Sequence, residues 1–333
     1  MNYRDSISSV LTPICEGYKK AVLFDFPTYD NVGDLAIWLG EVEFITHTLD
    51  IRIIAVEHCQ ATLLPELDRQ TLVFLSGGGN MGDLWPQHER FRLRVLQRYP
   101  DHRVVVLPQS IHFTSNEALE KSASITQSHA DLFLCVRDAP SAAIAETLVT
   151  KSRYRLCPDM ALVLGSLPRP ISPATPVFAL KRSDAERKEL GVLSPEIKAG
   201  DWVGSSPTFL GRMTRIFDRL QTRYPNRFLP LAGYRVRLYD ALAREHLERG
   251  LKLLSQAEVV ITDRLHAHIL CVLLGIPHVV LDNSYGKISR FRQQWKTGEG
   301  ICVVADSWDE ATHAAAELPR SDMRKDTDKW ATE

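Results

Sequence analysis

Arg264 and His266, an arginine and a histidine two residues apart, are the side chains of this sequence best suited to chemistry on an anion. They follow the apolar run 259–261, which predicts a buried strand, and precede apolar residues at helical spacing. Helix-start N–H groups and a guanidinium bind carboxylate or phosphate, and an imidazole titrates near neutral pH. The pattern predicts a phosphorylated or carboxylated substrate. The alternative is that Arg264 pairs with Asp263 or another carboxylate and that His266 is a hydrogen-bonded core residue.

A run of three glycines, 77–79, follows the predicted strand 71–75 and precedes Asn80. Consecutive glycines cost folding entropy, so we expect unusual backbone dihedrals or a close approach of the backbone to a ligand. With Gly82, the spacing formally matches a dinucleotide-binding motif, but no acidic residue sits at the end of a suitable following strand about twenty residues on, as that motif requires. The loop therefore predicts a surface for phosphate or sugar, and NAD is rejected.

Another loop, between the predicted strand 21–26 and a helix expected from Leu35, carries Asn31, Gly33 and Asp34. Gly33 permits a tight turn, and the two polar side chains can brace that turn or cap the helix. A strand, a glycine-containing loop and a helix in succession also place backbone N–H groups against a ligand. Turn chemistry and ligand binding both remain open here.

Three further cations follow predicted strands: Arg137, Arg182 and Lys287, the last in an expected polar loop. Open α/β sheets bind their ligands at the carboxyl ends of strands, so each cation is a candidate anion ligand. The alternative for Arg137 is a surface pair with Asp138. The arginine-rich stretch 90–98 predicts a solvated helix face.

Strands and helices alternate through both halves of the 333-residue chain, which is longer than one typical α/β domain. Segment 166–176 contains four prolines, the composition of a stiff connector. We therefore expect two doubly wound, Rossmann-like α/β domains facing a cleft: residues 1–166, a linker at 167–176, and residues 177–333.

Composition excludes several classes of protein. The formal net charge is −1, which argues against nucleic acid as a partner. The six cysteines are scattered without a C-x-x-C pair, so a disulfide framework or a structural zinc site is not expected. The N-terminal residues lack the apolar core of a signal peptide, and no apolar stretch is long enough to span a membrane. We expect a cytoplasmic protein, at most peripheral to a membrane.

Three motifs taken together resemble the polysaccharide pyruvyl transferases: Asp30–Asp34, Ser76–Asn80 and Thr262–His266. Their order and separations fit that family over roughly residues 20–295. The resemblance implies a GT-B-like pair of domains, phosphoenolpyruvate as donor, and a sugar diol of an exopolysaccharide or cell-surface glycan precursor as acceptor, often lipid-linked. The products would be a pyruvate ketal and phosphate. No metal or cofactor is implied, and the donor would bind the C-terminal domain.

Phosphoenolpyruvate carries a carboxylate and a phosphate, so its pocket needs at least two cations. Arg264 is the first, and His266 is suited to protonate the methylene carbon and to remove hydroxyl protons. A carboxylate, Asp34 or Asp263, would stabilise developing charge. The expected catalytic residues are thus His266, Arg264 and Asp34. The expected substrate-binding residues are Asn31, Gly33, Gly77, Gly78, Gly79, Asn80, Arg137, Arg182, Asp263, Leu265, Ser284 and Lys287.

Two other functions fit the same residues. A GT-B glycosyltransferase with a nucleotide-sugar donor would also collect cations for a diphosphate, and a donor panel would separate the two enzymes. A non-catalytic glycan-binding protein would keep its function after His266→Ala, whereas a transferase would lose turnover. Three aromatic residues could stack on a sugar or pack in a core: Tyr29, Trp85 and Tyr285.

Overall fold

The structure, a computed structural model, describes residues 2–183, 190–203, 208–223, 232–282 and 286–319. The chain divides into two compact units. Unit 1 comprises Met1–Gly165 and Gly204–Leu247, and unit 2 comprises Ser166–Val203 and Glu248–Glu333. The predicted boundary placed 204–247 in the second half, whereas these residues group with unit 1. The strand expected at 227–231 lies outside the described residues.

Unit 1 is built on a seven-stranded parallel sheet in the order β2-β1-β3-β5-β6-β7, with β4 also paired to β5. The central strands β1, β3, β5 and β6 are mostly apolar runs buried on both faces, as is typical of parallel sheets covered by helices. Their bounds are β1 Lys20–Phe24, β2 Arg52–Glu57, β3 Thr71–Leu75, β4 Gly78–Gly82, β5 Val104–His112, β6 Leu132–Val136 and β7 Tyr154–Leu156. Glycines 78 and 79, expected in a loop, thus lie in the short strand β4.

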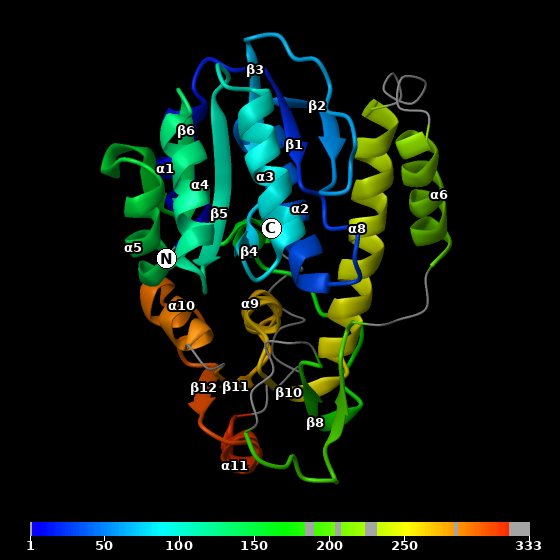
Figure 1. The fold of residues 1–333 in the computed structure, drawn as a ribbon. Coiled ribbons are helices and arrows are strands. Elements are labelled where there is room, and N and C mark those ends of the chain that lie inside the picture. The colour runs from blue at the N-terminus through cyan, green and yellow to red at the C-terminus, as the bar shows by residue number, and fades with distance from the viewer. Residues whose placement is uncertain (1, 184–189, 204–207, 224–231, 283–285, 320–333) are drawn as a thin grey trace. The chain divides into compact units, whose positions relative to one another are not determined.

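Helices α2, α4 and α5 of unit 1 begin where a side-chain oxygen accepts a hydrogen bond from the first turn; these oxygens belong to Asn31, Ser115 and Asp138. Helices α3 and α4 pack side by side (Figure 1). The helical segments are α1 Tyr3–Cys15, α2 Val32–Glu43, η1 Phe44–Thr48, α3 Pro86–Arg98, α4 Asn116–Ser128, α5 Ala139–Leu148, η2 Lys151–Arg153, η3 Met160–Leu164, α6 Phe209–Arg223 and α8 Ala232–Ser255, the last of which extends into unit 2.

Unit 2 repeats the architecture on a smaller scale, with a five-stranded parallel sheet in the order β12-β11-β10-β8-β9. Its core contains Val259, Ile261, Val279 and Trp308, all buried. The elements are β8 Thr175–Leu180, β9 Lys198–Gly200, β10 Ala257–Thr262, α9 Leu265–Leu274, β11 His278–Leu281, α10 Lys287–Trp295, β12 Cys302–Ala305 and α11 Trp308–Glu317. The expectation of two doubly wound α/β domains is confirmed.

The proline-rich segment expected as a stiff connector is tied to unit 2 by hydrogen bonds. The Leu167 N–H donates to the Leu273 carbonyl at 2.8 Å, and the Ala174 N–H donates to the Gln256 carbonyl at 2.8 Å. The segment leads directly into β8 at Thr175. Its prolines stiffen it, but these hydrogen bonds fix its path. In the part of the chain that the structure describes, no helix has both the length and the apolar character to cross a membrane.

Candidate functional site

Each sheet has a point where the strand order reverses. In unit 1 the chain passes from β1 to β2 on one side and then to β3 on the other (Figure 1). In unit 2 it passes from β8 to β9 and then to β10. The loops that leave the two central strands therefore diverge at the carboxyl ends of the strands, where open α/β sheets bind ligands. Most of the described candidate residues lie near one or the other of these switch points, whereas Arg137 follows β6.

At the switch point of unit 2, hydrogen bonds join the ends of β8 and β10. The Thr262 hydroxyl donates to the Leu180 carbonyl at 2.9 Å, and the Arg182 N–H donates to the Asp263 carboxylate at 2.8 Å. Burial raises the pKa of Asp263, although the Arg182 N–H and the guanidinium groups of Arg182 and Arg264 oppose the rise. Asp263 therefore braces the strand ends, and Arg182 is held beside it as the sequence predicted.

Arg264 stands between β10 and α9, and a partner far along the chain holds its side chain. The residue is 4% exposed, and its guanidinium donates to Asp201, 63 residues away, at 2.7 Å. It also lies 5.9 Å from the centroid of the Trp202 ring. Asp201 in turn accepts from the Ser183 hydroxyl at 2.8 Å. The carboxylate that pairs with Arg264 is thus Asp201, and the guanidinium is oriented in surroundings that screen charge weakly.

His266 lies in the first turn of α9 and is half-buried, so its imidazole remains accessible to solvent. Within the described residues, no side chain caps this helix start, at which Arg264 is the N-cap residue. The N–H groups of the first turn therefore face the switch point with the positive end of the helix dipole. Leu265 is buried, so its apolar side chain packs inside, and only its backbone N–H is suited to a ligand.

Lys287, expected in a polar loop, instead lies at the first position of helix α10 and is half-buried. Asp282 fixes the start of this helix, because its carboxylate accepts from the N–H groups of Ile288 at 2.8 Å and of Ser289 at 3.1 Å. Ser284 and Tyr285 lie outside the described residues.

His268, one turn into α9, belongs to a buried chain of hydrogen bonds. Its Nδ1 lies 2.8 Å from Nε2 of His278, and its Nε2 lies 2.7 Å from the Thr297 hydroxyl. His278 Nδ1 lies 2.7 Å from the Ile276 carbonyl, which can only accept, so His278 donates there and accepts from His268. Burial lowers the pKa of His278 to about 4 and that of His268 well below its usual value, so both rings are neutral at pH 7. The pair is structural.

In unit 1 the predicted Asn31 and Asp34 meet at the start of α2. The Asn31 Oδ1 accepts from the Gly33 N–H at 3.1 Å, and its Nδ2 donates to Asp34 at 2.7 Å. The Tyr29 hydroxyl donates to the same carboxylate at 2.8 Å. Helix α2 therefore begins at Val32, earlier than expected, and Gly33 lies inside it. The orientation of the Asp34 carboxylate is fixed, because Tyr29 and Asn31 both donate hydrogen bonds to the same oxygen, Oδ2.

The glycine run adjoins this carboxylate and has steric reasons for its composition. A Cβ on Gly77 would lie 2.6 Å from the Pro108 carbonyl oxygen, and Gly78 has φ +128°. A Cβ on Gly78 would lie 3.7 Å from Asp34 Oδ1, so the end of β3 and the start of α2 share one surface.

Glu41, buried on α2, accepts from the Gly77 N–H at 2.6 Å and from the Ser76 hydroxyl at 2.8 Å. Glu41 was not identified as a site residue from the sequence, although an acidic residue on an apolar helix face could have indicated a buried carboxylate.

Glu41 provides a prediction about pH. Burial outweighs the hydrogen bonds from Gly77 and Ser76 and raises the Glu41 pKa from 4.5 to about 8. The folded state thus binds this proton more tightly than the unfolded chain, so its stabilising effect is complete below pH 4.5 and is lost as the pH rises through about 8. In Glu41→Gln, the thermal midpoint should fall less between pH 5 and 8.5 than in the wild type. Glu120→Gln, on the exposed surface of α4, is the control, and equal slopes in both variants would contradict the prediction.

Asn80 is fixed by a polar network that the sequence did not reveal. Its Oδ1 accepts from Arg92 at 2.8 Å and from Gln109 Nε2 at 3.1 Å. Its Nδ2 lies 3.5 Å from Asp25, which follows β1 and pairs with His88 at 2.7 Å. Arg92, expected on a solvated face, is fully buried for this reason. The contacts join positions that are distant in sequence, so periodicity could not show them.

Arg137 is fully buried at the end of β6 and pairs with Asp159, which is also fully buried. Its Nε donates to the Ser110 hydroxyl at 2.8 Å, and that hydroxyl donates to Asp138 at 2.6 Å. The expected surface pair with Asp138 is therefore replaced by a buried pair with Asp159. These contacts give Arg137 a structural role in joining strand ends.

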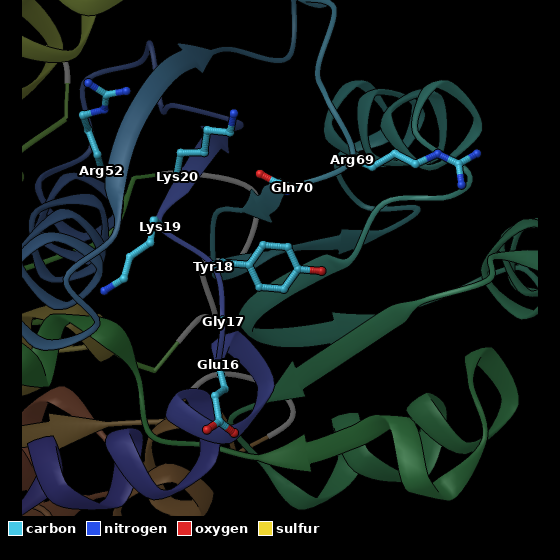
Figure 2. A pocket seen from close by; sticks show the side chains of 8 residues that line it. All are labelled: Glu16, Gly17, Tyr18, Lys19, Lys20, Arg52, Arg69 and Gln70. Atoms are coloured by element: carbon cyan, nitrogen blue, oxygen red, sulfur yellow. The ribbon is translucent and has the colours of Figure 1, made fainter.

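A pocket of about 730 Å³ lies at the opposite edge of the sheet of unit 1, where β1 and β2 begin (Figure 2). Its cations are largely neutralised: Lys19 pairs with Asp50 at 3.1 Å, Arg69 with Asp101 at 3.0 Å, and Lys20 with Asp68. The lining residues are Glu16, Gly17, Tyr18, Lys19, Lys20, Arg52, Arg69 and Gln70. Ligands of such sheets bind at the other edge, so this pocket is not the candidate site.

The fold and its switch points define a doubly wound α/β protein with cations and polar side chains at its strand ends. The model of the family "Polysaccharide pyruvyl transferase" matches residues 31–285. The chain therefore belongs to the polysaccharide pyruvyl transferase family. In unit 2 the match takes in Arg182, Arg264 and His266, and in unit 1 it begins at Asn31.

Two relatives that are named pyruvyl transferases agree with this family assignment. Pyruvyl transferase 1 of Schizosaccharomyces pombe is 31% identical over 325 residues, which is 89% of this chain and 75% of that protein. EpsO of Bacillus subtilis, provisionally named a pyruvyl transferase, is 31% identical over 297 residues, covering 87% of this chain and 89% of EpsO. A crystal structure of an uncharacterized Klebsiella pneumoniae protein shares the fold, with a TM-score of 0.58 and 18% identity over 89% of this chain and 95% of that one.

Proposed function

We propose that this protein transfers the three-carbon unit of phosphoenolpyruvate to two hydroxyls of a glycan, giving a pyruvate ketal and phosphate. The observation that carries the proposal is the switch point of unit 2, where Arg264, held by Asp201, adjoins a helix start that carries a half-exposed His266. Membership in the pyruvyl transferase family supports the reaction type. We further propose that the acceptor is an exopolysaccharide or cell-surface glycan precursor, lipid-linked or free, and that the reaction is cytoplasmic and needs no cofactor.

The donor carries two anionic groups, which assigns roles to the cations of unit 2. Arg264 binds one group through its planar guanidinium, and Arg182, fixed through its N–H to Asp263, binds the other. Lys287, at the start of α10, adds positive charge for the phosphate. Because Arg264 is nearly buried, its charge is weakly screened, and each hydrogen bond to the donor is correspondingly strong.

His266 is the group proposed to move protons. In the first addition an acceptor hydroxyl bonds to the enol carbon of phosphoenolpyruvate, the methylene carbon gains a proton and becomes a methyl group, and the hydroxyl loses its proton. In the second step the carbon–oxygen bond to phosphate breaks, the neighbouring hydroxyl bonds to the same carbon, and the proton of that hydroxyl passes through His266 to the leaving phosphate. An imidazole serves as acid in one transfer and base in the other, which typically contributes ~10²–10⁴-fold to the rate.

The acceptor is assigned to the switch point of unit 1. The Asp34 carboxylate, oriented by Asn31 and Tyr29, accepts hydrogen bonds from sugar hydroxyls, and Asn80 offers an amide fixed by Arg92. The glycine backbone at 77–79 permits a close approach of the sugar. Tyr29 is exposed next to Asp34, so its ring is available for a sugar face.

A donor panel tests this function and its alternative, a glycosyltransferase with a nucleotide-sugar donor. The protein is incubated with phosphoenolpyruvate and galactosides, glucosides or N-acetylmannosaminides, and released phosphate is measured. Parallel reactions contain nucleotide sugars, and released nucleotide is measured. We expect acceptor-dependent release of phosphate. Release of nucleotide, with phosphoenolpyruvate left intact, would replace the proposal with the alternative.

A further inference from the structure

A thiol, an imidazole and a carboxylate meet in unit 1 at the carboxyl ends of β1 and β2. Cys59 follows β2, Asp25 follows β1, and His88 lies in the first turn of α3. The Cys59 sulfur, a His88 ring nitrogen and an Asp25 carboxylate oxygen all lie within 4.8 Å of one another. His88 Nδ1 is 2.7 Å from Asp25 Oδ1. A nucleophile beside an imidazole that a carboxylate orients is the arrangement that activates thiols.

We propose that Cys59 is an activated thiol and a modification site, which reacts selectively with soft electrophiles and with hydroperoxides. Cys59 is half-buried, so small reagents can reach its sulfur. The geometry alone carries this proposal, since the cluster joins three segments of the chain that no transferase step described above uses.

Asp25 shows that the cluster is held in place. It is 2% exposed and has φ 73°, a left-handed conformation that is uncommon for a residue other than glycine. Such a backbone is strained and persists only where its surroundings enforce it. His88 binds one carboxylate oxygen, and Asn80 at 3.5 Å and Arg92 at 4.0 Å lie near the other. The carboxylate is therefore directed at the imidazole.

The charge of His88 follows from its neighbours. Burial by itself lowers the pKa of His88, but the hydrogen bonds and charges of Asp25 and Cys59 outweigh burial and raise it to about 10. Among the described residues, the other charged or titratable groups near the cluster include Arg92, from α3, and Tyr29, whose ring centroid lies 5.8 Å from that of His88. His58, next to Cys59, and Glu41, from α2, also interact electrostatically with Asp25. An imidazolium beside a thiol stabilises the thiolate, which is the reactive form.

The remaining cysteines provide the comparison, since the structure describes all six. Cys15, Cys135, Cys157 and Cys271 are buried. Cys302 is half-buried like Cys59, but burial raises its pKa to about 12. The imidazoles grouped with Cys302 are His268 and His278, which are neutral at pH 7. Cys302 is therefore a matched control within the same protein.

The reaction with a hydroperoxide is balanced without another reactant. The Cys59 thiolate attacks the terminal peroxide oxygen, a sulfur–oxygen bond forms, and the oxygen–oxygen bond breaks. Sulfur is oxidised to a sulfenic acid and the peroxide is reduced. The alkoxide or hydroxide that leaves takes the proton of the His88 imidazolium.

Alkylation rates test the proposal on the folded, full-length protein. Limiting iodoacetamide is added at pH 5.5–9, and peptide mass spectrometry measures the modification of Cys59 and Cys302; Cys59→Ser identifies the first adduct. At pH 6.5 Cys59 should react at least about tenfold faster than Cys302, because an ordinary thiol is only a few per cent thiolate near neutral pH. A Cys59 rate at pH 6.5 equal to that of Cys302 overturns the proposal.

Variants assign the effect to the imidazolium. His88→Gln should lower the Cys59 rate at pH 6.5 about tenfold, and Asp25→Asn should also lower it. His47→Gln, an exposed histidine of η1, should leave the rate unchanged. An unchanged Cys59 profile in His88→Gln overturns the proposal. If that variant does not fold, the rates in the wild-type protein decide, because a Cys59 thiol that is not activated would be alkylated no faster than Cys302.

Discussion

His266→Gln should lower kcat for ketal formation by about 10²–10⁴-fold and leave the KM for phosphoenolpyruvate within a few fold. Glutamine keeps a polar side chain of similar reach but cannot exchange protons near neutral pH, so the loss falls on proton transfer. His266 is half-buried in the first turn of α9, so its replacement should not disturb folding. Steady-state release of phosphate measures both constants.

The control for this variant is His313→Gln, an exposed histidine on α11. It should have the wild-type kcat, and both variants should have the wild-type thermal midpoint. If His266→Gln retains kcat within a few fold of His313→Gln, His266 has no role in proton transfer, and a non-catalytic binding protein becomes the better description.

Arg264→Lys should lower kcat/KM for phosphoenolpyruvate by about 10²–10³-fold, the range typical of losing one oriented donor to a developing anion. Lysine keeps the charge that Asp201 needs but loses the planar fork that binds a carboxylate or phosphate through two hydrogen bonds. An alanine would instead leave Asp201 without its charged partner and lower stability by about 3–5 kcal/mol. Lysine therefore separates recognition from folding.

Arg235→Lys is the matched control, because Arg235 is also buried and pairs with Glu57 at 2.6 Å within unit 1. Its thermal midpoint should fall, but its kcat/KM should stay near that of the wild type. If Arg264→Lys changes kcat/KM no more than Arg235→Lys does, the guanidinium of Arg264 does not bind the donor.

Local sequence signals predicted most of the fold and the positions of the candidate residues. Apolar runs of strand length, oxygen side chains at helix starts and polar residues directly after strands were sufficient to locate Asn31, Asp34, Arg182 and Arg264. These signals are reliable because each is determined by residues that are close to one another in the sequence. The fold then brings the strand ends together, since parallel strands end at one edge of a sheet.

Long-range partners could not be predicted in this way. Asp201 lies 63 residues from Arg264, and Asp25 lies 63 residues from His88. The reason for glycine at position 77 is a carbonyl oxygen of Pro108 in another strand. Each of these contacts depends on the order of strands in the sheet, which periodicity does not determine. The structural role of Arg137, through its pair with Asp159, was missed for the same reason.

Proton magnetic resonance of the product formed in D₂O tests the central claim most directly. The protein is incubated with phosphoenolpyruvate and the acceptor identified by phosphate release, and the purified product is examined. The account predicts a ketal methyl signal, with one deuterium incorporated because solvent-exchanged His266 delivers the proton to the methylene carbon. Vinyl signals, a transferred sugar, or a methyl group without deuterium would contradict it.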